Sequence, residues 1–386
     1  MTGARKMMMG GAAVGGANPD DGVWVWGVNN FGQLANGNTS TQSSPVQILN
    51  EVPTYINMGE RHIAIIKQDG TLHMAGRNDD GQLGLGDTTD RSSLTQVGSD
   101  TDWDQVACGF QHCIARKTNG TIFTWGDNAN GELGLGDTTD RSSPVQVGSL
   151  TTWTRVSATH QLCLGWKGTT LEGWGDANST GLGTDTGQKS SPVQIGTGFT
   201  NTRHSSQGAN GHMLSLHKTN NTVVVSGYGY RGGLDLNVSD KPSTTTLTQI
   251  GSAEWSWIAL GHFDCIGRKT NGQLFGWGTN FLGAAGTGNT GGSDTNSGFV
   301  AVSSPVHIGT SITWRGDNQA WGAGNMCHAA IDEDNQLYTW GSGQVNGNNS
   351  TTTNNVPTKV GSHSDYSMVG IGYRSVWAIR DSSIND

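Results

Sequence analysis

Short apolar runs of strand length recur along the chain and are separated by stretches rich in Gly, Asn, Ser and Thr. Val23 to Trp26 is the first such run, and no segment sustains a 3.6-residue apolar period without an intervening Gly. A helix needs that longer period, whereas short runs bounded by turn residues are typical of strands. The pattern therefore predicts an all-β protein.

The runs are organised in a repeat of about fifty residues. Its marker is a Gly that follows Trp in five units and Ala75 or Ser226 in the other two. These glycines are Gly27, Gly76, Gly126, Gly175, Gly227, Gly278 and Gly341, with spacings of 49, 50, 49, 52, 51 and 63 residues. Strand units repeated at such a period are typical of a β-propeller, whose blades are arranged radially.

Each unit continues from the Trp-Gly strand through a turn, a Gly-x-Leu-Gly segment, a Ser-Pro return strand, an aromatic-led strand and a Gly-x-x-His corner. In the third unit these parts include Trp125-Gly126, Gly131 to Gly134, and the return strand with Pro144. Gly permits positive φ at turns, and Pro fits a strand at a sheet edge. We interpret these residues as scaffold.

The two ends of the chain complement each other. The last unit stops at Val376 to Arg380 without a following Trp-Gly strand, whereas the first unit begins with an extra one at Val23 to Gly27. Pairing these segments within one blade would close the ring without an exposed strand edge. We therefore predict a seven-bladed propeller over residues 23–386, with an insertion at about 283–304, after a flexible Gly/Met/Ala-rich tail at residues 1–22.

Charge and hydropathy narrow the classes of partner. The formal net charge is -9, and Lys and Arg are scattered singly, so the chain has no basic stripe for a nucleic acid. No apolar run approaches the roughly 20 residues of a membrane-spanning helix. We expect neither a nucleic-acid partner nor a membrane span.

The cysteines form an odd set without CxxC spacing: Cys108, Cys113, Cys163, Cys265 and Cys327. Three of them, Cys113, Cys163 and Cys265, fall at one repeat position, so we interpret them as small buried side chains that face the core. A redox or zinc role is the alternative. On this reading we predict no metal site and no cofactor.

Two other chemistries find weaker support. The duplicated segments 86–91 and 136–141 read Gly-Asp-Thr-Thr-Asp-Arg and offer oxygen ligands for calcium, but they lack the EF-hand order, and we favour hydrogen-bonded surface turns. His62, His112 and His212 recur at one repeat position, where fixing the corner explains them. Because no nucleophile-base or paired-carboxylate arrangement stands out, we predict that the protein is not an enzyme.

The order of motifs resembles the repeat of the RCC1 family. The motifs are Trp125-Gly126-Asp127-Asn128, Gly81 to Gly86, Ser43 to Val46, and Gly109-Phe110-Gln111-His112. The resemblance covers about residues 23–386 and implies the seven-bladed fold, but fold does not fix function. The tail at Ala4 to Ala13 also resembles, over about ten low-complexity residues, the openings of marine bacteriophage structural proteins.

Three activities are implied by members of this family. Nucleotide exchange on a small GTPase depends on a β-wedge that nothing here clearly matches. Ultraviolet sensing uses Trp-containing corners, whereas the corners at 59–62 and 109–112 lack Trp, so we interpret most Trp residues as packing residues. A secreted bacterial inhibitor of β-lactamases binds its target through loops on one rim.

Transferring the contact positions of that inhibitor, by resemblance, predicts a binding rim from two corners of each unit. The rim residues are Phe31, Arg61, Phe110, His160, Tyr228, Tyr230, Arg231, Phe263, Phe281, Tyr373 and Arg374. Aromatic residues and Arg are frequent anchors of binding sites, whereas we expect the Asp-Thr-Thr-Asp-Arg loops on the opposite face. Each aromatic residue could instead only cap its own blade.

We therefore predict a non-catalytic recognition or structural propeller that binds a protein or a cell-surface ligand, glycans included. The Gly-, Ser-, Thr- and Asn-rich loops and the tail favour a bacteriophage virion or an extracellular setting over the cytoplasm. Regulation of a small GTPase and inhibition of a secreted protein are the alternatives. The partner and the oligomeric state stay open.

Overall fold

The computed structural model describes residues 18–176, 187–201, 213–218, 222–227, 244–250, 255–261, 264–288, 301–317 and 319–385. This part of the chain contains β-strands and three short 3₁₀-helices, η1 (Phe281–Gly283), η2 (Gly343–Val345) and η3 (Ser382–Asn385), without an α-helix. None of the helices in the described ranges is long and apolar enough to cross a bilayer. The all-β prediction agrees with this content.

Within the described ranges the strands form seven four-stranded antiparallel sheets, and in six of them the four strands are consecutive in the chain. The six contiguous sheets consist of β3 (Tyr55–Met58), β4 (His62–Ile66), β5 (Leu72–Gly76) and β6 (Arg91–Gln96); β7 (Trp103–Cys108), β8 (His112–Lys117), β9 (Ile122–Gly126) and β10 (Arg141–Gln146); β11 (Arg155–Ala158), β12 (Leu162–Lys167), β13 (Thr170–Asp176) and β14 (Gln188–Gly196); β15 (Phe199–Asn201), β16 (Met213–Lys218), β17 (Val223–Gly227) and β18 (Thr244–Gln249); β19 (Trp255–Leu260), β20 (Asp264–Lys269), β21 (Leu274–Thr279) and β22 (Ala301–Ile308); β23 (Trp321–Ala323), β24 (Cys327–Ile331), β25 (Leu337–Gly341) and β26 (Asn354–Lys359).

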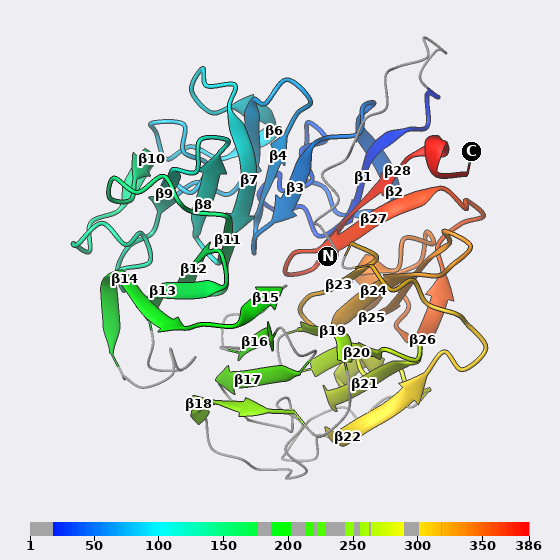
Figure 1. Cartoon of the computed structure of the whole chain (residues 1–386). Coiled ribbons are helices and arrows are strands. Elements are labelled where there is room, and N and C mark those ends of the chain that lie inside the picture. Colours follow the sequence, from blue (N-terminus) through cyan, green and yellow to red (C-terminus); the bar gives the residue numbers. More distant parts are fainter. Residues whose placement is uncertain are drawn as a thin grey trace, which may run out of the picture.

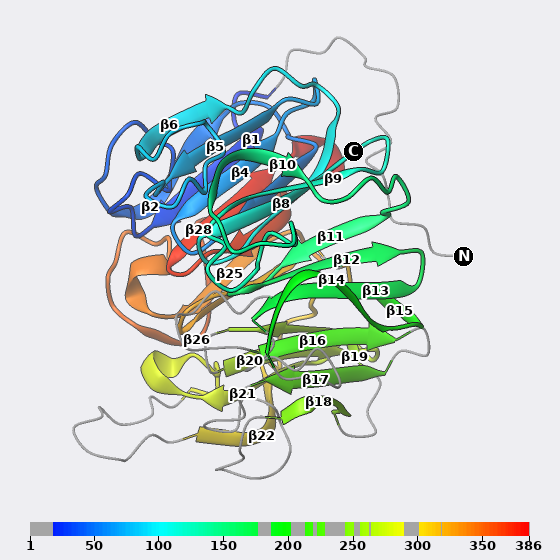
Figure 2. The ribbon, with the colours of Figure 1, turned by 90° about the vertical axis from the view of Figure 1, so that its left-hand side faces the viewer.

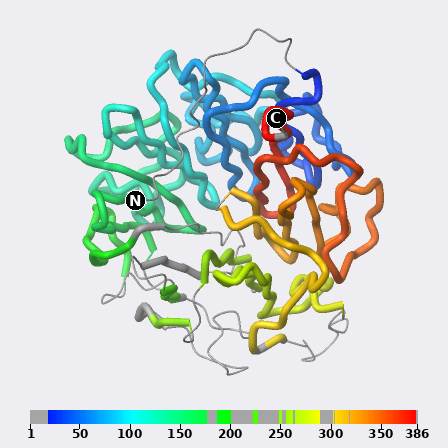
Figure 3. Tube along the Cα trace, turned by 45° about the vertical axis from the view of Figure 1, so that its right-hand side comes forward, coloured from blue at the N-terminus to red at the C-terminus, as the bar shows by residue number. Residues whose placement is uncertain are grey.

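The remaining sheet takes two strands from each end of the chain. Its strands are β1 (Gly22–Gly27), β2 (Gln42–Leu49), β27 (Tyr366–Ile371) and β28 (Ser375–Arg380), in the order β2-β1-β28-β27. The register of β1 and β28 runs without a shift from Gly22 opposite Arg380 to Gly27 opposite Ser375. Figures 1 and 3 show these blue and red segments side by side.

The count of seven blades from seven copies of one unit is corrected here, although the predicted pairing of the two chain ends is present. Only six sheets of the described chain are contiguous in sequence, and the other is assembled from the two ends. A last blade made only from C-terminal residues would leave the ladder groups of its edge unpaired, whereas β1 covers the edge of β28. The repeat counted from Trp-Gly therefore spans two neighbouring sheets.

The sheets surround a common centre, as Figure 1 shows, and Figure 2 shows strands of single sheets lying beside one another. The first strands of adjacent sheets, β3, β7 and β11, contact each other and so lie nearest the centre. The fourth strands lie outside, where Val193, Val306 and Val356 are exposed. Pro144 lies in such an outer strand, β10, which agrees with its prediction as an edge residue.

The apolar core lies between neighbouring sheets, and the Trp before the marker Gly connects them. Trp125 of β9 is fully buried, and its indole Nε1 donates to the Gln82 carbonyl oxygen of the preceding sheet's loop at 2.9 Å. Trp340 donates in the same way to Ala284 at 3.0 Å, and Trp26 donates to Val345 at 2.7 Å. The prediction that these Trp residues pack is confirmed.

Two glycines of the repeat explain why the motif requires Gly. Gly126 has a φ of +101°, and a Cβ there would lie 2.3 Å from the carbonyl oxygen of Gln111 in the adjacent corner. Gly84 has a φ of +68°, and its Cβ would lie 2.9 Å from Trp125 Nε1 of the next sheet. Both positions combine left-handed backbone with a close approach, which only Gly accepts without strain.

Candidate protein-binding rim

Two kinds of loop leave the sheets at the same end. His112 lies opposite Gly126 in the ladder, so the corner before β8 and the long loop after β9 leave the sheet at the same end. His62 opposite Gly76 and Ser375 opposite Gly27 place the equivalent loops likewise. We call this end the rim, and define it by corners 59–61, 109–111, 159–161, 324–326 and 372–374 and by loops 28–41, 77–90, 127–140 and 280–288.

The Asp-Thr-Thr-Asp-Arg segments also lie on the rim, so their predicted location on the opposite face is wrong. Arg91 is paired with Gly76, and Arg141 is paired with Gly126, which places both segments in the loops that follow the Trp-Gly strands. The opposite face is formed by turns such as 118–120 and connections such as 147–154. A loop that leaves a sheet at the rim must return to it at the rim, and the prediction of the opposite face did not take this into account.

The prediction that these segments form hydrogen-bonded turns is confirmed. Asp87 Oδ1 accepts from the Thr89 backbone N–H at 2.9 Å, and Asp87 Oδ2 contacts Arg91 at 2.6 Å. Asn78, which is fully buried, donates to the carbonyl oxygens of Asp87 and Thr89 and accepts from the Leu83 N–H. Protein donors thus occupy the oxygens that a calcium ion would need.

Seven of the predicted binding residues are described, and all of them lie on the rim. They are Phe31, Arg61, Phe110, His160, Phe281, Tyr373 and Arg374. The other four lie outside the described residues: Tyr228, Tyr230, Arg231 and Phe263. Except for His160, which is buried, the described members are half-buried, so part of each side chain is available for contact.

Several of these side chains contact each other across sheet boundaries. The guanidinium carbon of Arg61 lies 4.8 Å from the centre of the Phe31 ring, and that of Arg77 lies at 5.6 Å. The rings of Phe110 and His160 have centroids 4.2 Å apart, and the Phe110 N–H donates to the His160 carbonyl oxygen at 3.1 Å. Phe31 and Phe110 therefore connect neighbouring blades and do not only cap their own.

A further pair closes this series at the chain's C-terminal corner. The Arg374 guanidinium lies 5.5 Å from the Tyr373 ring centre and donates to Asn325 Oδ1 at 3.3 Å. The Asn325 N–H donates to the Tyr373 carbonyl oxygen at 2.7 Å. The corners of adjacent sheets are thus fixed to one another by their backbones, which makes the rim a preorganised surface.

Carboxyl groups that sequence reasoning did not select lie between these corners. Gln111 Nε2 donates to Asp80, which joins the loop of one sheet to the corner of the next. Burial, with Asp79 and Asp127 adding to the effect, raises the pKa of Asp80 to about 6. Burial also raises the pKa of Glu132 to about 7, again with a contribution from Asp127. The two acids occupy different positions of the repeated loop, since Asp80 aligns with Asn130 and Glu132 aligns with Gln82, so the repeat did not mark them.

The comparisons with known proteins agree with this architecture. The family model described as "Regulator of chromosome condensation (RCC1) repeat" matches residues 20–66, 69–116 and 119–166, and a second model of the same description matches residues 103–132. The chain carries RCC1 repeats. They cover the first part of the propeller. The resemblance to the RCC1 repeat that the motifs indicated is confirmed.

Two solved structures and one curated relative define how far the similarity extends. Prp20p of Saccharomyces cerevisiae superposes with a TM-score of 0.78 at 17% identity over 95% of this chain and 93% of that one. Human WBSCR16 gives a TM-score of 0.76 at 17% identity over 94% and 99% of the two chains. At this identity the likeness shows the fold alone.

The curated relative is the X-linked retinitis pigmentosa GTPase regulator of Canis lupus familiaris. It is 37% identical over 75 residues, which are 19% of this chain and 8% of the relative. The match therefore spans a small part of the relative's length. It supports the presence of the repeat, whereas the activity and partners of the whole relative do not follow from it.

Proposed function

We propose that this chain is a non-catalytic recognition protein that binds a protein partner through its rim. The observation that supports the proposal is that a rim contact crosses each boundary between four neighbouring sheets. These contacts join Phe31 to Arg61, Asp80 to Gln111, and Phe110 to His160. Half-buried aromatic residues and Arg held in place by neighbours are typical anchors of protein interfaces.

Charge indicates the kind of partner. The rim carries Asp80 and Asp127 beside the aromatic corners, and no ion pair involving either carboxylate occurs among the described residues. With a formal net charge of -9, the protein repels acidic partners and attracts basic ones. We infer a partner whose contact surface carries Lys or Arg around an apolar centre.

The direct test is binding of the full-length protein to arrays of purified proteins and glycans. The combined variant Phe31→Ala, Phe110→Ala and Tyr373→Ala removes three anchors, and we expect at least about a tenfold loss of affinity for the partner that the wild type selects. Leu150→Ala is the matched control because Leu150 is an exposed apolar residue in the connection on the opposite face. Equal binding by the folded rim variant, or equal loss in the control, would contradict the proposal.

A second candidate function is regulation of a small GTPase. It is favoured by the similarity to a GTPase regulator and by the fold shared with Prp20p, a protein that binds Gsp1p and histones. The test is release of labelled guanine nucleotide from purified small GTPases in the presence of the protein. Acceleration that the rim variant loses and Leu150→Ala keeps would establish this function in place of simple docking.

Neither the described residues nor the comparisons bear on a virion or extracellular setting. That part of the sequence interpretation relied on loop composition and on residues 1–22, of which 1–17 lie outside the described residues. The proposal is therefore limited to recognition through the rim. Detection of the protein in purified virus particles would test the setting independently of the binding surface.

A further inference from the structure

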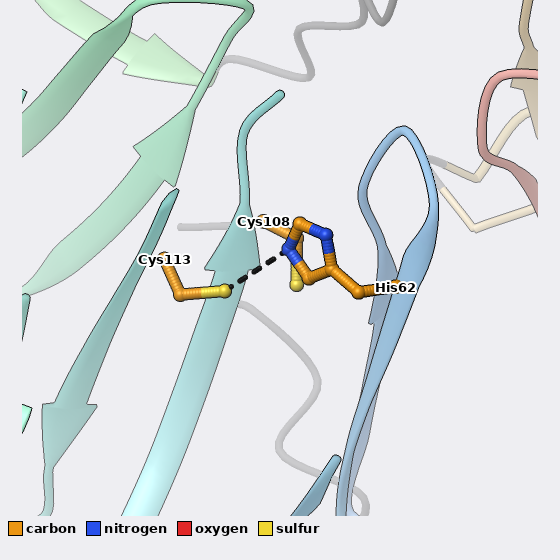
Figure 4. A group of neighbouring side chains, drawn as sticks. All are labelled: His62, Cys108 and Cys113. Carbon is orange, nitrogen blue, oxygen red and sulfur yellow. Dashed lines mark hydrogen bonds between the residues drawn. The ribbon is translucent and has the colours of Figure 1, made fainter. Parts of the chain in front are cut away.

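One boundary between two sheets contains a cluster of metal-ligating side chains that the rim does not use. His62 begins β4, Cys108 ends β7, and Cys113 follows His112 in β8 (Figure 4). All three side chains are buried, and their ligand atoms lie within 4.8 Å of one another. His62 Nε2 lies 3.2 Å from Cys113 Sγ.

We propose that His62, Cys108 and Cys113 bind a zinc ion that links two adjacent blades. The separations between the three ligand atoms are close to those of a zinc site. Tetrahedral zinc with Zn–S of about 2.3 Å and Zn–N of about 2.0 Å places its ligand atoms about 3.5 to 3.8 Å apart. The observed separations reach those values through shifts of a few tenths of an ångström to about 1 Å. A further oxygen donor, the Gln82 carbonyl, lies 3.6 Å from Cys113 Sγ.

The charge balance also favours a divalent ion at this depth. Zinc would displace one proton from each thiol, and Zn²⁺ with two thiolates and a neutral imidazole carries no net charge. A neutral complex avoids the large penalty of an unpaired ion in an apolar interior.

The next boundary of the ring provides a natural comparison. Cys108 lies opposite Cys113 across its corner, and the equivalent pair in the following sheet is Ala158 opposite Cys163. His112 occupies the position of His62. That boundary thus has the His and one Cys but lacks the second thiol, so of these two boundaries only the first has all three ligands.

The same comparison supplies variants that should fold. Cys108→Ala creates the residue that this position already has in the next sheet, at Ala158, and therefore preserves the packing of the corner. Cys163→Ala is the control, because it removes an equally buried thiol from the boundary without a second Cys. His62→Ala removes the ligand that comes from the neighbouring blade.

The experiment loads the full-length, reduced protein with zinc, removes free metal, and measures bound metal by mass spectrometry. We expect about one equivalent in the wild type and in Cys163→Ala, and at least a tenfold lower content in Cys108→Ala and His62→Ala. A chelator should lower the unfolding temperature of the wild type and of Cys163→Ala, but not of Cys108→Ala.

Two results would overturn the proposal. One is a wild type that retains no more zinc than Cys108→Ala after loading. The other is cobalt substitution of the reduced wild type without the thiolate charge-transfer absorption of bound cobalt, a measurement that stays valid if a variant fails to fold. Rim binding of the protein partner does not depend on either readout, so the two proposals fail separately.

Discussion

The sheets β3–β6 and β7–β10 are near copies whose rim loops differ in charge at one buried position. In both loops a buried Asn, Asn78 or Asn128, donates to the carbonyl oxygen nine residues on at 3.0 or 3.1 Å. Gln82 in the first sheet and Glu132 in the second are both fully buried, and both accept a backbone N–H two residues earlier, at 2.9 and 2.8 Å.

This comparison teaches that the loop geometry selects an acceptor but not its charge. An amide oxygen and a carboxyl oxygen satisfy the same backbone N–H equally well. At this position desolvation distinguishes the two loops, because burial raises the pKa of Glu132 to about 7 while Gln82 has no charge to bury. The two copies are thus equivalent in structure and different in pH response.

The largest expected effect on stability comes from adding a side chain at the Gly that packs against a Trp of the next sheet. Gly134 has a φ of +68° and a Cβ there would lie 2.6 Å from Trp174 Nε1, whereas Gly148 has a φ of +58° with nothing within 4 Å. Both Ala variants incur backbone strain of about 1 kcal/mol, but only Gly134→Ala adds a clash of about 2 kcal/mol or more. Urea unfolding should separate them, and equal losses would show that the contact relaxes freely.

The second prediction concerns how the charge at this buried position changes stability with pH. Because the pKa of Glu132 is raised, the folded state keeps a proton that the unfolded chain has released, and stability falls as the pH rises from about 4.5 through about 7. Glu132→Gln should therefore stabilise the protein at pH 8 by about 2 to 3 kcal/mol and leave stability near pH 4 little changed.

The reciprocal variant sharpens that test. Gln82→Glu should lose stability above pH 7 and approach the wild type at low pH, since it places a carboxyl in the matching buried position. Urea midpoints measured at several pH values supply both profiles. A pH-independent difference for either variant would mean that packing, and not ionisation, separates the two loops.

The smallest effect concerns the Trp contact between sheets. Trp125 Nε1 donates to Gln82 at 2.9 Å, whereas the buried Trp174 Nε1 has no hydrogen-bond partner in the part of the chain that the structure describes. Trp125→Phe and Trp174→Phe remove similar apolar area, so the first should cost about 1 kcal/mol more for the lost hydrogen bond. Thermal or urea unfolding of the pair checks this, and an equal cost would show that the hydrogen bond adds no net stability.

The strand content, the repeat and the pairing of the chain's ends could be predicted from the sequence. Short apolar runs and Gly turns are local features that a sequence shows directly. The repeat boundaries were less informative, since the unit marked by Trp-Gly spans two sheets and the closing sheet is shared by both termini. Rim residues such as Phe31 and Phe110 were placed on the correct end because a strand pair separates the two corners.

The Asp-Thr-Thr-Asp-Arg loops were misplaced for a related reason. Their sequence shows turns, but the face on which a turn lies depends on how many strands precede it, and the loops return to the end that the Trp-Gly strand leaves. The raised pKa values of Asp80 and Glu132 were also beyond the sequence, because burial at a boundary depends on the neighbouring sheet.

By itself the sequence determined the local elements of this protein: Gly where φ must be positive, Trp where a strand ends, and the same turn in both Asp-Thr-Thr-Asp-Arg segments. Only the tertiary structure decided which of these residues meet. His62 and Cys113 are 51 residues apart in the chain and 3.2 Å apart in space, and the near copy with Ala158 lacks the third ligand. The reason is that contacts between blades combine residues one repeat apart, and the sequence of a single repeat contains no record of its neighbour.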